Sequence, residues 1–438
     1  MQRTFLLPLL ALSSLAHADD VNEPLRRKSV FGAQFAVAEG KGIEIKGVLP
    51  KLTAEAAGFK AGDILVSVDG TALAAPANLT LALRTKYAGD SVTIEYLREG
   101  KKESKKVKLA PRPMQQSTDT MEVKYSQVVS NGKRIRLILT HPKKPGKYPL
   151  VMLVGGIGAY SVDGEFPAFP YGEILGPLAA EGYATARIDK PGQGDSEGPV
   201  YAELGFNTEL DAYRQAIKAL PSFDFVNPDK IAIYGHSMGG AFGPLLGAEL
   251  KLAGVVAAST MVKSWPEYML ENTRRQMILA GSPESEISGF VRQLDAVSHY
   301  FFYEGKTADQ VIKERPELAA VVKDLVPDGK TYSGVGLPFF KELADHDTAA
   351  AWSKVTAKVL LLCGANDFVA SEQDHPIIAR IVNAAHPGNA EYVQVPESDH
   401  AFRKATSWPD AFRSRMSGPF NPAVLDTLKA WLKKTIGS

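Results

Sequence analysis

Two patterns of hydrophobic and polar positions divide the chain into two parts. Residues 26–110 contain short runs in which apolar and polar residues alternate, such as Ile43–Val48 and Ser91–Leu97. Alternation with a period of two is typical of strands that bury one face. Between these runs, a short helix is expected at 54–58 and a longer one at 75–87. This part is therefore predicted to form a small, β-rich domain.

From residue 121 to residue 438, short apolar runs take turns with longer segments of helical periodicity. Such runs are typical of strands that are covered on both faces. The first two strands are separated by Asn131-Gly132, a strong signal for a two-residue hairpin. An opening hairpin followed by alternating strands and helices predicts a mostly parallel sheet with helices on both faces. Strands are expected at 121–130, 134–140, 150–154, 184–188, 231–234, 254–258, 359–363 and 391–395, and helices at 171–181, 203–220, 238–250, 373–386 and 420–435.

The first 18 residues have the composition of a secretory signal peptide. Arg3 is followed by an apolar segment from Phe5 to Ala16 and by an Ala-His-Ala ending before two aspartates. The apolar segment is too short to span a membrane in the mature protein. We therefore expect export to the bacterial periplasm or out of the cell, with no membrane span after signal removal. A buried or membrane-anchoring first helix is the alternative.

Composition and charge limit the possible functions. With 438 residues and 45% hydrophobic side chains, the chain can bury large cores and is long enough for two or three domains. The formal net charge of +1 gives no bulk argument for a nucleic-acid partner or an anionic membrane surface. The lysine-rich run 98–108 is interrupted by Glu99 and Glu103, and Val107 and Leu109 alternate with charge at its end, so a solvated hairpin is expected. The polar, proline-containing segment 111–120 is expected to be a linker.

One short motif carries the candidate nucleophile. The apolar run Ile231–Tyr234 leads directly into Gly235-His236-Ser237-Met238-Gly239, and helix-forming residues follow. This is the strand, tight turn and helix that a G-x-S-x-G nucleophile elbow requires, because only flanking glycines leave room for the turn. Ser237 is therefore the predicted nucleophile.

A serine hydroxyl needs a histidine base and an acid that orients this histidine. Asp367 lies in the loop after the predicted strand 359–363, and His400 lies in the loop after the strand 391–395. Loops at the carboxyl ends of parallel strands gather at the edge where open α/β sheets bind ligands. Asp399 is a rival acid, but its adjacency to His400 makes a reach to the ring awkward. We therefore expect a triad of Ser237, His400 and Asp367.

The order of strands, with the nucleophile after the fifth, resembles the α/β-hydrolase fold. Acyl transfer needs donors for the developing oxyanion. One is expected to be the backbone N–H of Met238, and the resemblance implies that Ile157 N–H in Gly155-Gly156-Ile157-Gly158 is the other. That loop and the segment 188–196 are similar to those of a group of bacterial α/β-hydrolase esterases, although Ser161-Val162 and Pro191 depart from the pattern. These departures bear on substrate preference.

An insertion is expected between the strand 254–258 and the strand 359–363. Residues 261 to about 350 interrupt the alternation and contain helical stretches with many aromatic residues. The position resembles that of the helical cap which covers the site in α/β-hydrolases and shapes the acyl or alcohol pocket. We expect the aromatic residues mainly to form the core of this cap.

The N-terminal part has its own resemblance. Residues 56–70, Ala-Ala-Gly-Phe-Lys-Ala-Gly-Asp-Ile-Leu-Val-Ser-Val-Asp-Gly, closely resemble PDZ domains that are attached to bacterial periplasmic proteases. A PDZ domain takes a peptide C-terminus as an added strand. The resemblance implies that Phe31, Gly32, Ala33 and Gln34 form the carboxylate-binding loop, with Ala33 standing where a larger apolar residue is usual. The alternative is that this domain only docks on its neighbour.

These observations predict an exported serine hydrolase that cleaves carboxylic esters through an acyl-enzyme intermediate. A serine peptidase acting on small peptides recruited by the PDZ domain is the alternative, a thioesterase remains open, and a non-catalytic peptide-binding protein is the remaining class. The expected partners are a small ester or acyl substrate and a peptide C-terminus. No metal or cofactor is expected, because no cluster has metal-ligand spacing and no phosphate-binding motif is present. The oligomeric state is left open.

Overall fold

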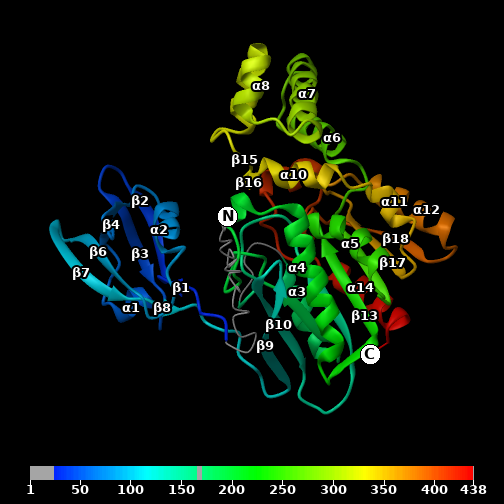
Figure 1. The fold of residues 1–438 in the computed structure, drawn as a ribbon, viewed down its shortest axis with the longest axis horizontal. Helices are drawn as coiled ribbons and strands as arrows, with labels where there is room; N and C mark the ends of the chain where they lie inside the picture. The colour runs from blue at the N-terminus through cyan, green and yellow to red at the C-terminus, as the bar shows by residue number, and fades with distance from the viewer. Residues whose placement is uncertain (1–23, 165–169, 438) are drawn as a thin grey trace, which may run out of the picture.

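The computed structural model describes residues 24–164 and 170–437. The predicted signal peptide at 1–18 lies outside the described residues. The described chain forms a small N-terminal lobe and a large C-terminal lobe (Figure 1). Within these ranges, no helix has the length and apolar character needed to cross a membrane.

The N-terminal lobe is a β-sheet with two short helices. Among the described residues it has six strands in the order β2-β3-β4-β6-β7, with β5 paired to β4. Alternate residues of β3, such as Ile43 and Ile45, are fully buried beneath the sheet, as the period of two predicts. The elements are β2 Ala33–Ala38, β3 Gly42–Val48, α1 Thr53–Ala56, β4 Ile64–Val68, β5 Thr71–Ala72, α2 Pro76–Leu83, β6 Ser91–Arg98 and β7 Lys101–Lys108.

Helix α2 is shorter than the sequence predicts. It ends at Leu83 instead of continuing to Tyr87. The backbone of Tyr87 is paired with Lys28 in an isolated bridge, and the side chains of Arg26 and Lys28 lie over the Tyr87 ring. The pairing with a distant segment therefore competes with the last turn of the helix.

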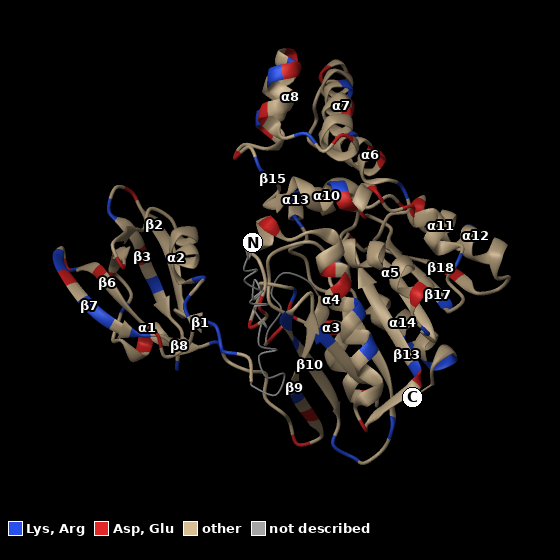
Figure 2. Ribbon diagram, in the orientation of Figure 1, with Lys and Arg blue, Asp and Glu red and all other residues tan. Residues whose placement is uncertain are grey.

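Strands β2 and β7 form the two edges of this sheet. Strand β7 is exposed except for Val107, so the expected solvated hairpin is present. Figure 2 shows the cationic positions along it. Lysines at an edge are a common means of blocking further strand pairing. The lysines of β7 are Lys101, Lys102, Lys105, Lys106 and Lys108.

The chain enters and leaves the N-terminal lobe through a pair of short strands. Strand β1, Ser29–Val30, pairs antiparallel with β8, Ala110–Pro111. The segment expected to be a linker, 111–120, therefore begins within a strand. Further along it, Gln115 N–H donates a hydrogen bond to the Tyr125 hydroxyl on the C-terminal lobe at 2.6 Å. Part of this segment is thus held against the C-terminal lobe.

The C-terminal lobe is built on a mixed sheet. In the described chain this sheet has eight strands in the order β18-β17-β14-β13-β11-β12-β10-β9. The first two in sequence form an antiparallel hairpin, and the others are parallel to one another. The strands are β9 Met121–Ser130, β10 Lys133–Pro142, β11 Tyr148–Val154, β12 Ala184–Ile188, β13 Val226–His236, β14 Gly254–Ala258, β17 Lys358–Gly364 and β18 Ala390–Val395.

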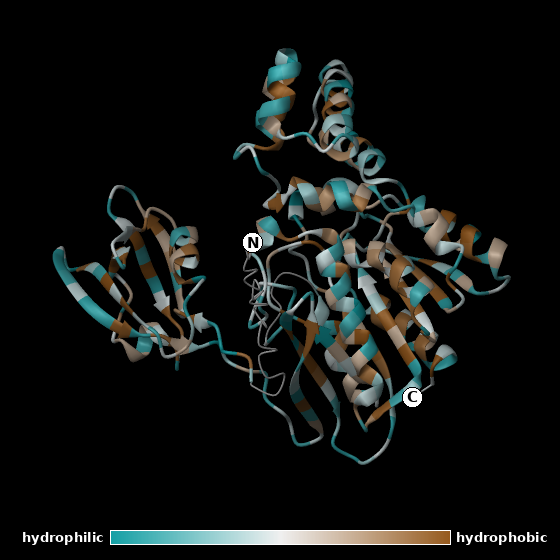
Figure 3. Ribbon diagram, in the orientation of Figure 1, coloured by the Kyte–Doolittle hydropathy of each residue, from teal (hydrophilic) through white to brown (hydrophobic). Residues whose placement is uncertain are grey.

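Helices cover both faces of this sheet. Met152 of β11 packs in the same core as Phe242 of α5, whereas its neighbour Val151 packs in a second core with Leu428 of α14. Successive side chains of a strand point to opposite faces, so both faces are buried. Figure 3 shows the resulting hydrophobic central strands. The helices are α3 Tyr171–Ala180, α4 Phe206–Ala219, α5 Met238–Glu249, α12 Asp374–Ala385, α13 Trp408–Ser414 and α14 Pro422–Thr435.

A mainly helical segment follows β14 and stands over the carboxyl ends of the strands (Figure 1). Several of its aromatic residues, such as Phe302, Phe339 and Phe340, are fully buried, whereas Tyr303 is exposed. The buried aromatic residues form the core of the insertion, as expected. Its elements are α6 Trp265–Leu279, α7 Glu284–Ser298, a π-turn at His299–Tyr303, α8 Ala308–Glu314, α9 Ala319–Leu325, the strand pair β15 Thr331–Tyr332 and β16 Val335–Gly336, α10 Leu337–Ala344 and α11 Thr348–Trp352.

Candidate active site

Ser237 lies on a strained turn between β13 and α5. Its backbone has φ 56° and ψ −122°, a conformation that non-glycine residues rarely adopt and that functional sites retain. A side chain at Gly239 would place its Cβ 1.9 Å from the carbonyl oxygen of Val154, so only glycine fits there. Ser237 N–H donates to Ala258 O on the neighbouring strand at 2.8 Å. The turn thus projects the hydroxyl from the carboxyl edge of the sheet, as the motif predicts.

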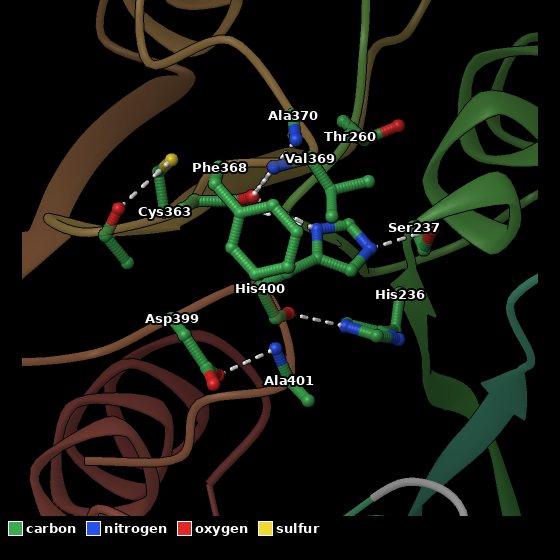
Figure 4. Close-up of polar contacts among 12 residues, drawn as sticks. His236, Ser237, Thr260, Cys363, Phe368, Val369, Ala370, Asp399, His400 and Ala401 are labelled. Carbon is green, nitrogen blue, oxygen red and sulfur yellow. Dashed lines mark hydrogen bonds and ion pairs between the residues drawn. The ribbon is translucent and has the colours of Figure 1, made fainter. Parts of the chain in front are cut away.

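The structure brings Ser237, His400 and Asp367 together. His400 Nε2 lies 3.0 Å from Ser237 Oγ (Figure 4). His400 Nδ1 lies 3.0 Å and 3.1 Å from the two carboxylate oxygens of Asp367. Because a carboxylate only accepts, Nδ1 carries the proton, and Nε2 is free to accept from the serine hydroxyl. The three residues come from loops after three different strands.

The electrostatics of the site keep Asp367 ionised. Burial alone would raise its pKa, but the charge and hydrogen bond of His400 and the N–H groups of Ala370 and Val369 outweigh it, so the pKa of Asp367 is lowered. These N–H groups donate to Oδ1 at 2.8 Å and 2.9 Å. A buried carboxylate with this many donors is a stable orienting group for a histidine.

Asp399, the rival acid, does not approach the His400 ring. Its Oδ1 accepts hydrogen bonds from Ala401 N–H and Arg403 N–H, both at 2.9 Å, within its own turn (Figure 4). Asp399 therefore shapes the loop that presents His400.

The glycine loop after β11 is surrounded by tyrosine hydroxyls. Three of its N–H groups donate to them: Gly155 to Tyr213 at 3.0 Å, Gly156 to Tyr171 at 2.8 Å, and Gly158 to Tyr201 at 2.8 Å. Ile157 N–H, between them, has no hydrogen-bond partner among the described residues. Met238 is the first residue of α5, where helical N–H groups have no partner within the helix. Ile157, Met238 and Ser237 line one cavity.

A buried ion pair supports this loop from behind. Lys190 Nζ donates to Gly156 O at 2.5 Å and lies 3.0 Å from the carboxylate of Glu209. Their side chains are 1% and 0% exposed. Burial lowers the pKa of Lys190 and raises that of Glu209, and the attraction between the two opposes both shifts. The sequence analysis missed this pair. The signal was a glutamate on the apolar face of α4, between Phe206 and Tyr213.

The candidate site opens into an apolar cavity of about 210 Å³. Trp265 and Tyr268 of α6 line it, although the sequence analysis assigned the aromatic residues of the insertion mainly to its core. No aspartate or glutamate of the described chain is among its lining residues. They are Ile157, Ser237, Met238, Ser259, Thr260, Met261, Trp265, Tyr268, Val369, Ala370, His400 and Met416.

Helix α6 also holds the loop that carries Asp367. Arg275 Nη1 donates to the carbonyl oxygens of Val369 and Ala370 at 3.0 Å and of Phe368 at 3.3 Å. Asn272 Nδ2 donates to Val369 O at 2.5 Å. The insertion therefore fixes one wall of the cavity and the loop of the acid at the same time.

The predicted carboxylate loop of the N-terminal lobe lies at a second hollow, a groove of about 440 Å³. Phe31, Gly32 and Ala33 line it together with Leu79 and Leu83 of α2, as the resemblance implies. Gln34 is not among its lining residues. Its side-chain oxygen instead lies over Gly47 of β3, where an added Cβ would be only 3.3 Å away. The structure thus brings three of the four predicted residues to the groove.

The described residues contain no group of three or more His, Cys, Asp or Glu side chains that could hold a metal ion. Cys363 is a free, buried thiol in β17.

Two family models match the chain. Residues 167–403 match the family described as serine aminopeptidase, S33, and residues 29–109 match the PDZ domain. A probable periplasmic serine protease do/HhoA-like of Haemophilus influenzae is 39% identical over 75 residues, 17% of this chain. The chain spans 16% of the length of that protease and 10% of the length of a magnetosome formation protease of Paramagnetospirillum magneticum.

Two further relatives match longer stretches of the chain. Esterase EstD of Thermotoga maritima is 21% identical over 297 residues, 68% of this chain and 65% of the esterase. The quorum-quenching protein AidA of Acinetobacter baumannii is 24% identical over 268 residues, 60% of this chain and 84% of the relative. Among solved structures, Est1E of Butyrivibrio proteoclasticus with ferulic acid has 17% identity and a TM-score of 0.46, covering 71% of this chain and 99% of that one.

Proposed function

The chain belongs to the serine aminopeptidase, S33, family of α/β-hydrolases and carries a PDZ domain, and from this premise we propose that it is an exported serine hydrolase that cleaves carboxylic esters. The predicted fold class is thereby confirmed. In the proposed domain plan, the signal peptide spans 1–18, the PDZ domain 26–110, the linker 111–120 and the hydrolase domain 121–438, with the cap at 261–350.

The observation that carries this proposal is the hydrogen-bonded series Asp367–His400–Ser237 at the carboxyl edge of the sheet. Ser237 Oγ would attack the ester carbonyl carbon while His400 Nε2 takes its proton. The carbonyl electron pair moves to the oxygen, and the N–H groups of Met238 and Ile157 would stabilise that oxyanion. The C–O bond then breaks, and His400 gives its proton to the leaving alcohol.

The second half of the reaction would regenerate the enzyme. A water molecule gives a proton to His400 Nε2 and attacks the acyl carbon, and the resulting oxyanion occupies the same two N–H groups. Collapse of this intermediate releases the carboxylic acid and returns the proton to Ser237 Oγ. Asp367 would hold the ring in the required tautomer and stabilise its cationic form in both halves.

The lining of the cavity favours esters of apolar acyl groups over peptides with a free amino terminus. An aminopeptidase must hold the α-ammonium group of its substrate, and a desolvated ammonium group without an acidic partner is strongly unfavourable. The cavity beside Ser237 is lined by apolar and neutral residues, with no acidic side chain from the described chain. The family description keeps an aminopeptidase as the second candidate.

Export is the second part of the proposal. Residues 1–18 have the composition of a signal peptide, and the PDZ relative of Haemophilus influenzae is described as periplasmic. The PDZ domain would bind a peptide C-terminus in the groove lined by Phe31, Gly32 and Ala33.

The triad is tested with p-nitrophenyl butyrate and a fluorophosphonate probe. We expect Ser237→Ala and His400→Ala to lower kcat by about 10⁴-fold or more and to abolish labelling, since triad residues act as a unit. Ser104→Ala, an exposed serine on β7, is the matched control and should behave as the parent. Equal labelling of the parent and Ser237→Ala would remove the assignment.

The substrate class is tested with a pair of esters that differ by one amino group. Leucine ethyl ester carries the α-ammonium group, and ethyl 4-methylpentanoate lacks it. We expect a higher kcat/KM for 4-methylpentanoate. A preference for the leucine ester, together with cleavage of leucine anilide, would establish the aminopeptidase instead.

A further inference from the structure

The peptide groove of the PDZ domain is built from both domains. One side is formed by Phe31, Phe35, Leu79 and Leu83, which give it an apolar surface. Gly192, Gln193 and Gly194, which belong to a loop of the hydrolase domain, line the same groove. Strand β2 is an edge of its sheet, so its outer hydrogen-bonding groups are available to an added strand.

The groove also carries uncompensated positive charge. Lys28, Arg84 and Arg112 line it. No described acidic side chain forms an ion pair with Arg84 or Arg112, and Arg112 Nε is buried without a hydrogen-bond partner. The Lys28 ammonium group donates only to a backbone carbonyl, Arg84 O, at 3.2 Å, and lies over the Tyr87 ring. Two guanidinium groups that have no acidic partner among the described residues complement a carboxylate, which accepts strong charge-assisted hydrogen bonds.

Buried ion pairs fix the hydrolase loop beside the groove. Arg27 Nη1 lies 2.5 Å from Asp195 Oδ2, and Arg27 Nη2 lies 3.4 Å from Asp163 Oδ2. Lys28 N–H donates to Asp195 Oδ1 at 2.8 Å. Both aspartates are less than a tenth exposed. The strand that leads into Phe31 is therefore fastened to the loop that contains Gly192–Gly194.

The same loop reaches the candidate active site at its other end. Gly194 has φ +49°, and a Cβ there would fall 1.8 Å from Asp189 Oδ2, so this part of the loop is packed directly on Asp189. The next residue, Lys190, donates to Gly156 O, next to Ile157 N–H. A displacement at Gly192–Gly194 would therefore reach the glycine loop 155–158 through the contacts made by Asp189 and Lys190.

We propose that the hydrolase loop Gly192–Gly194 completes the peptide groove. A peptide with a free C-terminal carboxylate and an apolar last residue then binds between the two domains. Its binding changes the rate of hydrolysis through Lys190. The carboxylate lies between the N–H groups of the Phe31–Ala33 loop and the guanidinium groups of Arg84 and Arg112. Lys190 is a positioning residue that acts through the glycine loop 155–158. The rate effect rests on the serine-hydrolase function proposed above, whereas the binding site does not.

The binding site is tested on the full-length protein with fluorescein-labelled octapeptides ending in Val, Leu or Phe, each as the free acid and as the C-terminal amide. Fluorescence anisotropy should show at least 10-fold tighter binding of one or more acids than of the matching amides. Gln193→Glu places a negative charge on the side of the groove that the loop Gly192–Gly194 forms, and it should weaken the binding of the acid peptide at least fivefold. Arg112→Gln removes a positive charge from the groove and should weaken this binding by a similar factor. Lys106→Ala, an exposed lysine of β7, is the control and should bind as the parent.

The rate effect is tested by hydrolysis of p-nitrophenyl butyrate with a saturating amount of the bound acid peptide. We expect kcat to change at least threefold with a smaller change in KM, since an oxyanion hole acts in the transition state. The double variant Lys190→Met/Glu209→Gln removes both buried charges together, because a lone buried charge could prevent folding. It should bind the peptide within twofold of the parent affinity and lose the rate response. Lys106→Ala should keep the response.

Distinct outcomes separate the possible failures. Equal affinity for acid and amide, or unchanged binding by Gln193→Glu, would overturn the interdomain groove. An unchanged kcat in the parent with bound peptide would overturn the link to Lys190. If no ester is hydrolysed at all, the proposed function fails, and hydrogen exchange at the amides of 155–158 with and without the acid peptide decides the link. Identical exchange would then reject it.

Discussion

At the residue scale, His236 adjoins Ser237 in sequence, but its side chain contacts the backbone of His400. Its Nε2 lies 2.8 Å from His400 O, which only accepts, so this nitrogen carries the proton. Its Nδ1 accepts from the Tyr171 hydroxyl at 3.1 Å. The His236 ring therefore holds the backbone of His400 in place, and it must be neutral for Nδ1 to accept from Tyr171 as well.

The neutrality of His236 predicts a pH-dependent stability. Burial, followed by the charge of His400, lowers the pKa of His236 to about 3 from an ordinary 6.5. Below pH 6.5, His236 becomes protonated in the unfolded chain but stays neutral in the native state. The unfolded state is therefore stabilised relative to the native state as the pH falls. The free energy of unfolding can be measured with urea for the parent and for His236→Gln. Between pH 6.5 and about pH 4, the parent should lose about 3 kcal/mol more of this free energy than the variant.

A free-energy difference between these two proteins that stays constant over this pH range would show that the native His236 titrates like an exposed histidine. The same measurement on Ser237→Ala should give the pH dependence of the parent, because this variant keeps the His236 ring and both of its contacts.

The sequence identified Ser237, Asp367 and His400 because each follows a strand at the same edge of a parallel sheet. The residues that support them could not be found in this way. Lys190 and Tyr213 lie on a loop and a helix whose approach to the glycine loop depends on how the helices pack on the sheet. The structure places Met238 and Ile157 beside Ser237, and their role as oxyanion donors stays a prediction.

At the scale of elements, α6 links the cap to the loop of the acid. Arg275 donates to three successive carbonyl groups, from Phe368 to Ala370, and is almost fully buried. The N–H groups of this loop in turn donate to Asp367. The cap is therefore attached to the edge of the sheet that carries Asp367 through Arg275, together with the hydrogen bond from Asn272 to Val369 O.

Removing this attachment should reduce catalysis. We expect Arg275→Met to lower kcat for p-nitrophenyl butyrate by about 10- to 100-fold, because small misplacements of an orienting group are costly in the transition state. Arg274→Met is the matched control, since Arg274 lies on the same helix and pairs at the surface with Glu284. Its kcat should stay within twofold of the parent. Equal losses in the two variants would mean that the helix contributes only stability.

Periodicity predicted the strands of the main sheet of the hydrolase domain and five of the helices that cover it, because these elements bury apolar side chains at regular spacing. It did not predict α13 or the separate helices of the cap. It was less informative where an element contacts a partner distant in sequence. Helix α2 loses its last predicted turn to the pairing of Tyr87 with Lys28. Trp265 and Tyr268 look like other aromatic residues of the cap, and only the tertiary structure shows that they face the cavity.

At the scale of the whole molecule, the two domains are joined by buried charges. The Arg27 side chain contacts both Asp195 and Asp163, and Arg136 lies 3.6 Å from Asp195. These partners are far apart in sequence, so no local pattern could reveal them.

Neutralising one of these charges should loosen the attachment of the domains. Asp195→Asn removes the closest acidic partner of Arg27, and it also removes the carboxylate that faces the buried Arg136. A buried charge that loses its partner is destabilising. Limited proteolysis should then cleave within 111–120 several times faster than in the parent. Asp229→Asn, which breaks an exposed pair with Lys251, should leave that rate unchanged. Equal cleavage of all three proteins would show that the attachment does not depend on Asp195.

The lysines of β7 bear on how the protein behaves at high concentration. An unpaired edge strand can pair with the edge strand of a second copy and start aggregation. A row of lysine ammonium groups along that edge makes the two copies repel each other. The opposite edge strand, β2, has no lysines, and the groove between β2 and α2 is the proposed site of one extended peptide. The lysines and the proposed peptide site therefore lie at opposite edges of the same small sheet. Replacing the lysines should promote aggregation without weakening the proposed peptide binding.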